Sequence, residues 1–138
     1  RVLFRSVMGH IGLTPQSVNR LGGFRVQGRT ELDAARLLDE AHALEALGCF
    51  SIVLECVPAD VAASITSELA IPTTGIGAGA GTDGQVLVLQ DLWGVDTSHT
   101  PRFVRRYIDG ECLLTEALNR YAADVKETRF PSPEESYS

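Results

Sequence analysis

The sequence predicts an α/β fold in which parallel strands alternate with helices. Short apolar segments rich in β-branched residues recur at residues 50–54, 71–76 and 86–89, and a further strand is expected near Val7. Amphipathic patterns separate most of them, and strands joined through helices pair in parallel. Two architectures fit this order: an open doubly wound sheet, or part of a (β/α)₈ barrel. A whole barrel takes about 250 residues, and this chain has 138, so a barrel would be about half present.

The first helix is predicted to begin at Thr30. Its hydroxyl can accept hydrogen bonds from the free N–H groups of the first turn, and Asp33 occupies the acidic position of a capping box. Gly48 is placed to end the helix in a left-handed conformation. Between these limits, apolar residues recur at three- and four-residue spacing: Ala34, Leu37, Leu38, Ala41 and Leu44.

The elements after this helix follow the same alternation. Residues 50–54 are continuously apolar, which indicates a strand covered on both faces. Pro58 suits the first position of the next helix, whose apolar face would consist of Val61, Ile65 and Leu69. Residues 71–76 and 86–89 are predicted as buried strands on either side of a glycine-rich turn at 75–81. Two amphipathic segments follow, around residues 103–107 and 113–125, and a polar end at 131–135 that we expect to be frayed.

Composition limits the classes of partner. The chain is 44% hydrophobic and carries a net charge of −6 from 12 basic and 18 acidic residues. A nucleic-acid partner is disfavoured because it requires a basic face. No apolar run approaches the roughly 20 residues of a membrane helix, and no signal-peptide pattern is visible. The three cysteines lack paired metal spacing: Cys49, Cys56 and Cys112. Cys49 and Cys56 flank an apolar strand and suit small hydrophobes, and a reducing, cytoplasmic setting is expected.

Glu55 is the first candidate for a catalytic residue, because it ends the strand at residues 50–54. The loops that follow parallel strands build the active site in such folds, so this carboxylate is expected to face a substrate and to serve as a general base. An equal alternative is a structural acid that caps the next helix or pairs with an arginine. His10 lies between two glycines and could donate to a substrate oxygen, although a histidine satisfied within its own loop fits as well.

The remaining candidates have structural explanations. Gly79, Gly81 and Gly84 fit the spacing G-x-G-x-x-G, but the following residues suggest a strand rather than the helix of a dinucleotide site. The glycines are better explained by close approach of the backbone to a neighbour or a ligand. Asp91 is either a site residue or a helix cap, and we expect His42 and His99 to be exposed.

Several segments together resemble the ketopantoate hydroxymethyltransferase family. They are, in order, VMGHIGLTPQ at 7–16, GGFRVQGR at 22–29, VLECVP at 53–58, IPTTGIGAG at 71–79, DGQVLV at 83–88 and FP at 130–131. The resemblance runs almost without interruption from Val7 to the C-terminus.

This resemblance implies a (β/α)₈ barrel of the phosphoenolpyruvate/pyruvate type, with roughly its last four strands present at residues 7–127 and a tail at 128–138. It implies transfer of a hydroxymethyl group from 5,10-methylenetetrahydrofolate to 3-methyl-2-oxobutanoate, giving 2-dehydropantoate for pantothenate and coenzyme A synthesis. The family's general base falls on Glu55 and its substrate-side histidine on His10. The family also uses Mg²⁺ and forms homo-oligomers.

The first residues depart from the family pattern. Residues 1–6 do not resemble the strand expected before residue 7, and the family's Mg²⁺ ligands lie on earlier strands. We therefore expect this chain to be the C-terminal half of the enzyme, inactive alone. The alternative hypothesis is a short non-catalytic α/β module that binds a small anion or a nucleotide at the glycine-rich turn 75–81.

Overall fold

The computed structural model describes residues 6–17, 23, 25–95 and 100–137. They form two compact units, Arg1–Val86 and Leu87–Ser138, which are described separately. The atypical stretch predicted at residues 1–6 falls outside the described residues except for Ser6, and His99 falls outside them as well.

Four parallel strands form the sheet of the first unit: β1 (Met8–Gly12), β2 (Ser51–Glu55), β3 (Thr73–Ile76) and β4 (Gly84–Gln85). They lie in the order β1-β2-β3-β4, and every neighbouring pair is parallel. A doubly wound sheet reverses its strand order at a switch point, whereas these four strands follow one another in chain order. The predicted parallel α/β fold is confirmed, and its strand order is that of an arc of a (β/α)₈ barrel.

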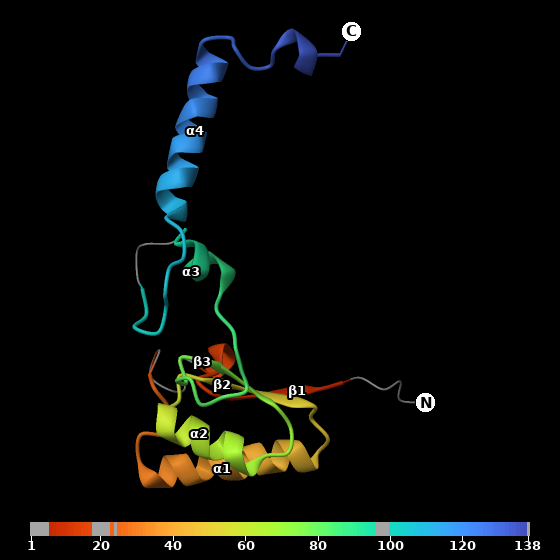
Figure 1. Ribbon diagram of the computed structural model, residues 1–138, viewed down its shortest axis with the longest axis vertical. Helices are drawn as coiled ribbons and strands as arrows, with labels where there is room; N and C mark the ends of the chain where they lie inside the picture. Colours follow the sequence, from red (N-terminus) through yellow and green to blue (C-terminus); the bar gives the residue numbers. More distant parts are fainter. Residues whose placement is uncertain (1–5, 18–22, 24, 96–99, 138) are drawn as a thin grey trace. The chain divides into compact units, whose positions relative to one another are not determined.

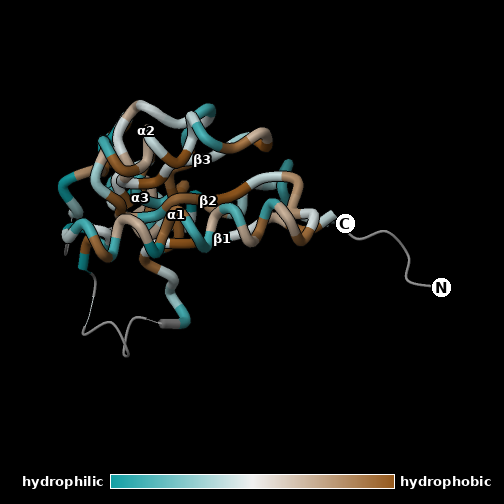
Figure 2. The backbone as a smooth tube through the Cα atoms, turned by 90° about the horizontal axis from the view of Figure 1, so that it is seen from below, coloured by the Kyte–Doolittle hydropathy of each residue, from teal (hydrophilic) through white to brown (hydrophobic). Residues whose placement is uncertain are grey.

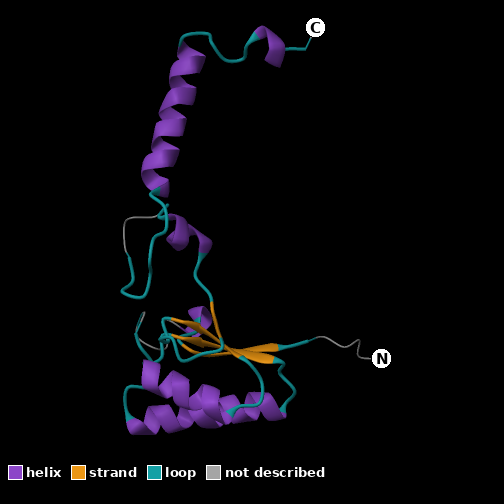
Figure 3. Cartoon of the chain, in the orientation of Figure 1, coloured by secondary structure: helices purple, strands orange, loops and turns teal. Residues whose placement is uncertain are grey.

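Helices α1 (Glu31–Ala46) and α2 (Ala59–Glu68) cover one face of this sheet, as Figures 1 and 3 show. Hydrophobic residues line β2, while α1 alternates between hydrophobic and hydrophilic positions (Figure 2). Side chains from both layers form the core between them: Ile11, Leu37, Ala41, Ile52, Leu54, Val57, Ala62, Ile65 and Ala78. We call the opposite face of the sheet the site face. Because Val53 and Glu55 on that face are only half-buried, the prediction that β2 is covered on both faces is only partly correct.

The helix limits agree with the predicted caps. The Thr30 hydroxyl accepts a hydrogen bond from the Asp33 N–H at 3.1 Å and donates to the Asp33 carboxylate at 2.8 Å. Gly48 has a φ of +88° and follows the end of α1 by two residues, as a left-handed cap requires. Pro58 immediately precedes α2, one position earlier than predicted.

The strand predicted at residues 86–89 is wrong. β4 ends at Gln85, and Leu89 begins the short helix α3 (Leu89–Trp93) of the second unit. Val86 and Val88 are each 47% exposed, so this apolar run is not a buried strand. A short apolar run has no periodicity that separates a strand from a chain leaving the sheet.

The second unit contains α3, the longer helix α4 (Gly110–Lys126) and a 3₁₀ turn, η2 (Pro133–Glu135). The predicted amphipathic segment at 113–125 lies within α4, whereas residues 103–107 form turns and irregular structure. The end expected to be frayed is ordered by a hydrogen bond from the Ser132 N–H to the Glu135 carboxylate, at 2.7 Å.

Candidate active site

Glu55 is the last residue of β2, at the carboxyl end of the parallel sheet. Its neighbours Leu54 and Ile52 point into the core, and alternation along a strand therefore directs Glu55 to the site face. Its side chain is 18% exposed. This is the position at which barrel enzymes hold their reacting groups.

His10 lies on the site face beside Glu55. It belongs to β1, so the expectation that it sits in a loop is wrong: the flanking glycines do not interrupt the strand. The atoms His10 Nε2 and Glu55 Oε2 are 2.9 Å apart. An ionised carboxylate can only accept, so Nε2–H is the donor. The structure thus brings together the two residues that the sequence singles out.

Three backbone hydrogen bonds fix the end of β2. The Leu13 N–H donates to the Glu55 carbonyl at 2.8 Å, and the Cys56 N–H donates to the Ile76 carbonyl at 2.9 Å. The Cys56 carbonyl accepts from the Gln27 N–H at 2.8 Å. The chain around the candidate base is therefore held from both neighbouring strands' ends and from the loop before α1.

Gly12 allows the close contact between β1 and β2 at this point. It has a φ of +88°, and a Cβ there would lie 2.2 Å from the Glu55 carbonyl oxygen. A side chain at position 12 would thus force the two strand ends apart. The glycine keeps the Glu55 backbone close to β1, which carries His10.

Cys56 adopts a left-handed conformation with a φ of +51°. Such backbone strain in a non-glycine residue costs about 1–3 kcal/mol and concentrates at functional sites. Burial, together with the adjacent charge of Glu55, raises the pKa of the Cys56 thiol. A raised pKa lowers the fraction of thiolate, which is the form that acts as a nucleophile or metal ligand. Cys49 is buried and free.

The glycine-rich turn packs against α2. A Cβ on Gly79 would lie 2.4 Å from the Cβ of Ala59, and a Cβ on Gly81 would lie 2.7 Å from the Cβ of Ala63. Ala59 and Ala63 are one helical turn apart. Of the two explanations left open by the sequence, a neighbour rather than a ligand accounts for both glycines.

The other candidates belong to different elements from the Glu55–His10 pair. Asp91 belongs to the first turn of α3 in the second unit, where Val88 is the N-cap, so Asp91 is not the cap of that helix. His42 is exposed on α1, 3.4 Å from the Glu68 carboxylate. Within the described ranges, no group of three or more His, Cys, Asp or Glu side chains could hold a metal ion.

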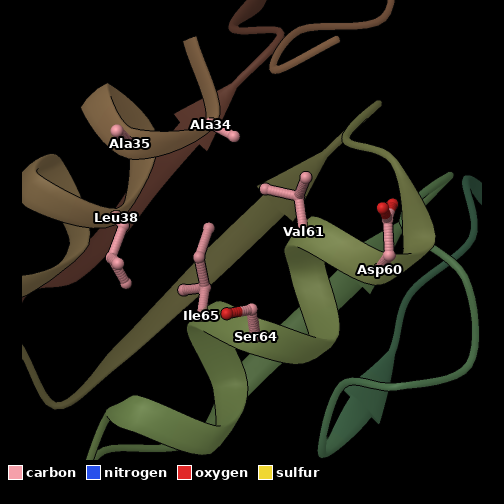
Figure 4. A pocket seen from close by; sticks show the side chains of 7 residues that line it. All are labelled: Ala34, Ala35, Leu38, Asp60, Val61, Ser64 and Ile65. Carbon is pink, nitrogen blue, oxygen red and sulfur yellow. The ribbon is translucent and has the colours of Figure 1, made fainter. Parts of the chain in front are cut away.

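A groove between α1 and α2 lies on the helix side of the sheet (Figure 4). Val61 and Ile65 of α2 point across it toward Leu38 of α1, and only Asp60 and Ser64 supply polar side chains. It is lined by Ala34, Ala35, Leu38, Asp60, Val61, Ser64 and Ile65. A substrate site needs convergent polar groups, so the site face is the better candidate.

Comparison with known proteins agrees with the motifs. A family model described as ketopantoate hydroxymethyltransferase matches residues 5–133. The chain belongs to the ketopantoate hydroxymethyltransferase family. This family is of the (β/α)₈ barrel type, which agrees with the strand order of this chain.

Two curated relatives illustrate the similarity. The 3-methyl-2-oxobutanoate hydroxymethyltransferase of Francisella tularensis subsp. tularensis (strain SCHU S4) is 57% identical over 131 residues, which cover 95% of this chain and 50% of that protein. The 3-methyl-2-oxobutanoate hydroxymethyltransferase of Methylobacterium sp. (strain 4-46) is 58% identical over 132 residues, which cover 96% of this chain and 46% of that protein. The chain therefore spans about half the length of the curated relatives it matches.

In the part of the chain that the structure describes, no helix is long and apolar enough to cross a membrane.

Thr74 is one further residue of the site face, and the sequence motifs do not single it out. Alternation along β3 could have found it: Thr73 is turned toward Asp83 and toward Thr66 of α2, so Thr74 faces the side of Glu55.

Proposed function

We propose that this chain carries the proton-abstracting half of a ketopantoate hydroxymethyltransferase. The reaction joins the methylene carbon of 5,10-methylenetetrahydrofolate to carbon 3 of 3-methyl-2-oxobutanoate, and water supplies the hydroxyl of the product 2-dehydropantoate. The two bonds from the methylene carbon to the folate nitrogens break, and tetrahydrofolate leaves with one proton from carbon 3 and one from water. The observation that carries the proposal is the 2.9 Å contact between His10 Nε2 and Glu55 Oε2 at the carboxyl end of the sheet.

Glu55 serves as the general base in this proposal. It removes the proton from carbon 3 of the 2-oxo acid, and the electron pair of the broken C–H bond becomes the enolate that attacks the methylene carbon. Only Glu55 Oε2 is occupied by His10, which leaves Oε1 available to a substrate among the described contacts. The backbone hydrogen bonds at Glu55 and Cys56 support a base held in one position, as proton transfer requires.

His10 serves as a substrate-side residue and fixes the orientation of the carboxylate through Nε2, which leaves its other ring nitrogen, Nδ1, for the substrate. Its side chain is 34% exposed, so a ligand on the site face can reach the ring. The 2-oxo acid is therefore expected to bind against β1, β2 and β3, with carbon 3 directed toward Glu55.

A Mg²⁺ site would require residues beyond the part of the chain that the structure describes. Mg²⁺ would acidify carbon 3 by polarising the neighbouring oxo group. The described residues bring together no group of three metal-ligating side chains, so they do not by themselves fit this ion and we assign no step to it. A cytoplasmic homo-oligomer, with small-molecule substrates and without nucleic-acid or membrane partners, completes the proposal.

The test joins the N-terminal half of the Francisella relative to this chain, restoring the length of that relative. Exchange of the carbon 3 hydrogen of 3-methyl-2-oxobutanoate for deuterium is followed by NMR in the presence of Mg²⁺. The fusion should catalyse exchange and the isolated chain should not. Glu55→Gln should slow exchange by about 10²–10⁴-fold, the usual contribution of a general base.

Glu68→Gln is the matched control, because Glu68 is an exposed carboxylate on α2 that pairs with His42. It should leave the exchange rate unchanged. Undiminished exchange by the Glu55→Gln fusion would remove Glu55 from the role of base. Exchange by the isolated chain would show that no further residues are needed.

A further inference from the structure

Three side chains form a row across the site face, on the N-terminal side of Glu55 along the strands: His10, Val53 and Thr74. The strand register aligns His10 with Val53, Val53 with Thr74 and Thr74 with Gly84. Since neighbouring strands are about 4.8 Å apart, His10 and Thr74 flank Val53 at roughly equal distances. Glu55 lies two residues beyond Val53 on the same strand, where its register partner on β3 is Ile76. His10 and Thr74 therefore stand on either side of Val53, two residues along the strands from the level of Glu55.

The Thr74 hydroxyl has no partner in the described part of the chain. Every other threonine hydroxyl of β3 and its loop is engaged: Thr73 with Thr66, and Thr82 with the Gly84 carbonyl. Thr74 is only half-buried, so its hydroxyl remains accessible from the site face.

Gly84 leaves the space beside this hydroxyl open. A Cβ on Gly84 would lie 3.6 Å from Thr74 Oγ1, which places the hydroxyl on the β4 side of Thr74. Gly84 does not have a positive φ, so its backbone does not require glycine. A methyl group there would make an ordinary van der Waals contact with the Thr74 hydroxyl and cover its β4 side.

We propose that Thr74 is a substrate-binding and specificity-determining residue, whose hydroxyl pairs with an oxygen of the 2-oxo acid bound against Glu55. This inference rests on the proposed function. With carbon 3 at Glu55, oxo and carboxylate oxygens directed along the strands toward Val53 would meet this row, which has a polar side chain on each side of Val53. His10 already bonds Glu55, whereas the Thr74 hydroxyl is uncommitted. Val53 between them supplies an apolar surface for the branched carbon skeleton.

The test measures binding of 3-methyl-2-oxobutanoate to the chain itself by NMR titration, using the signals of the His10 ring and the Val53 methyl groups. Thr74→Val keeps the shape of the side chain and removes the hydroxyl, so it should weaken binding about tenfold, the loss expected for one hydrogen bond to a charged ligand. Thr74→Ser keeps the hydroxyl and should bind within about threefold of the original chain. Gly84→Ala should also weaken binding, because its methyl group would cover the β4 side of the hydroxyl without straining the backbone.

The control is Thr115→Val on the exposed surface of α4, which should bind as the original chain does. Equal affinity of the Thr74→Val and original chains would overturn the assignment, as would the absence of binding at these two signals. The deuterium exchange of the Glu55→Gln fusion tests the proposed function separately. Loss of exchange in that variant together with unaltered binding by Thr74→Val would refute the role of Thr74 alone.

Discussion

Replacing Gly79 by alanine should destabilise the first unit more than the same replacement at Gly48. The two glycines have similar backbone conformations, with φ of +75° and +88°. They differ in their surroundings: a Cβ on Gly79 would lie 2.4 Å from the Cβ and 3.0 Å from the Cα of Ala59, and a Cβ on Gly48 would meet nothing within 4 Å. The comparison therefore separates the packing of the glycine-rich turn on α2 from backbone strain.

The surroundings of the two glycines determine how much stability each variant is expected to lose. An alanine in the left-handed region costs about 1–2 kcal/mol, of which roughly 0.4–1 kcal/mol is offset because alanine lowers the entropy of the unfolded chain. Gly48→Ala should thus lower the free energy of unfolding by roughly 0–1.6 kcal/mol. Overpacking adds about 1–3 kcal/mol, so Gly79→Ala should lower it by roughly 1–4.6 kcal/mol. Gly81 has no positive φ, and Gly81→Ala should show the packing cost alone.

Urea unfolding followed by circular dichroism measures the free energies of unfolding. The variants are compared with one common slope of free energy against urea concentration. Adding Ala59→Gly to Gly79→Ala should recover at least about 1 kcal/mol, since it removes one of the clashing carbons. If Gly79→Ala lost no more stability than Gly48→Ala, the turn would not be held by its contact with α2. A stable Gly79→Ala chain that had lost affinity for inorganic phosphate would favour an anion-binding turn instead.

Two further predictions concern the segment that leads into β3 and the thiol next to Glu55. Glu45→Ala should destabilise the first unit by about 1–2 kcal/mol in the same urea assay, because its carboxylate accepts from the Ala70 N–H at 2.7 Å and the Ile71 N–H at 3.2 Å. Burial and then the charge of Glu55 raise the pKa of the Cys56 thiol, so Glu55→Gln should lower that pKa and speed alkylation of Cys56 by iodoacetamide at a fixed pH below it. An unchanged alkylation rate would exclude the charge of Glu55 as a cause.

The elements predicted from local chemistry agree with the structure. The Thr30 cap, the left-handed Gly48 and the strand ending at Glu55 each depend on residues close in sequence, whose geometry is set before any distant contact forms. The strand predicted at residues 86–89 failed because burial decides such a run, and burial depends on what the rest of the chain covers.

The site was only partly predictable for a related reason. Glu55 could be located from its place at a strand end, but its contact with His10 depends on the register of two strands 45 residues apart. The register of β2 and β3 likewise decides the place of Thr74 beside Val53, which the surrounding motif does not reveal. A sequence specifies which residues alternate on a strand, whereas the pairing of strands specifies which of them meet.

The site face is assembled by the core on the other side of the sheet. Ile11 on β1 and Leu54 on β2 are buried against the helices, and Thr73 on β3 is engaged with α2 and Asp83. The side chain that each strand buries therefore fixes which of its residues face the helices and which face the other way. Because successive residues point to opposite faces, the residues next to these three are directed to the site face. They include His10, Glu55 and Thr74. A one-residue insertion within any strand would turn its site residue toward the helices, so the packing on α1 and α2 maintains the geometry of the candidate base.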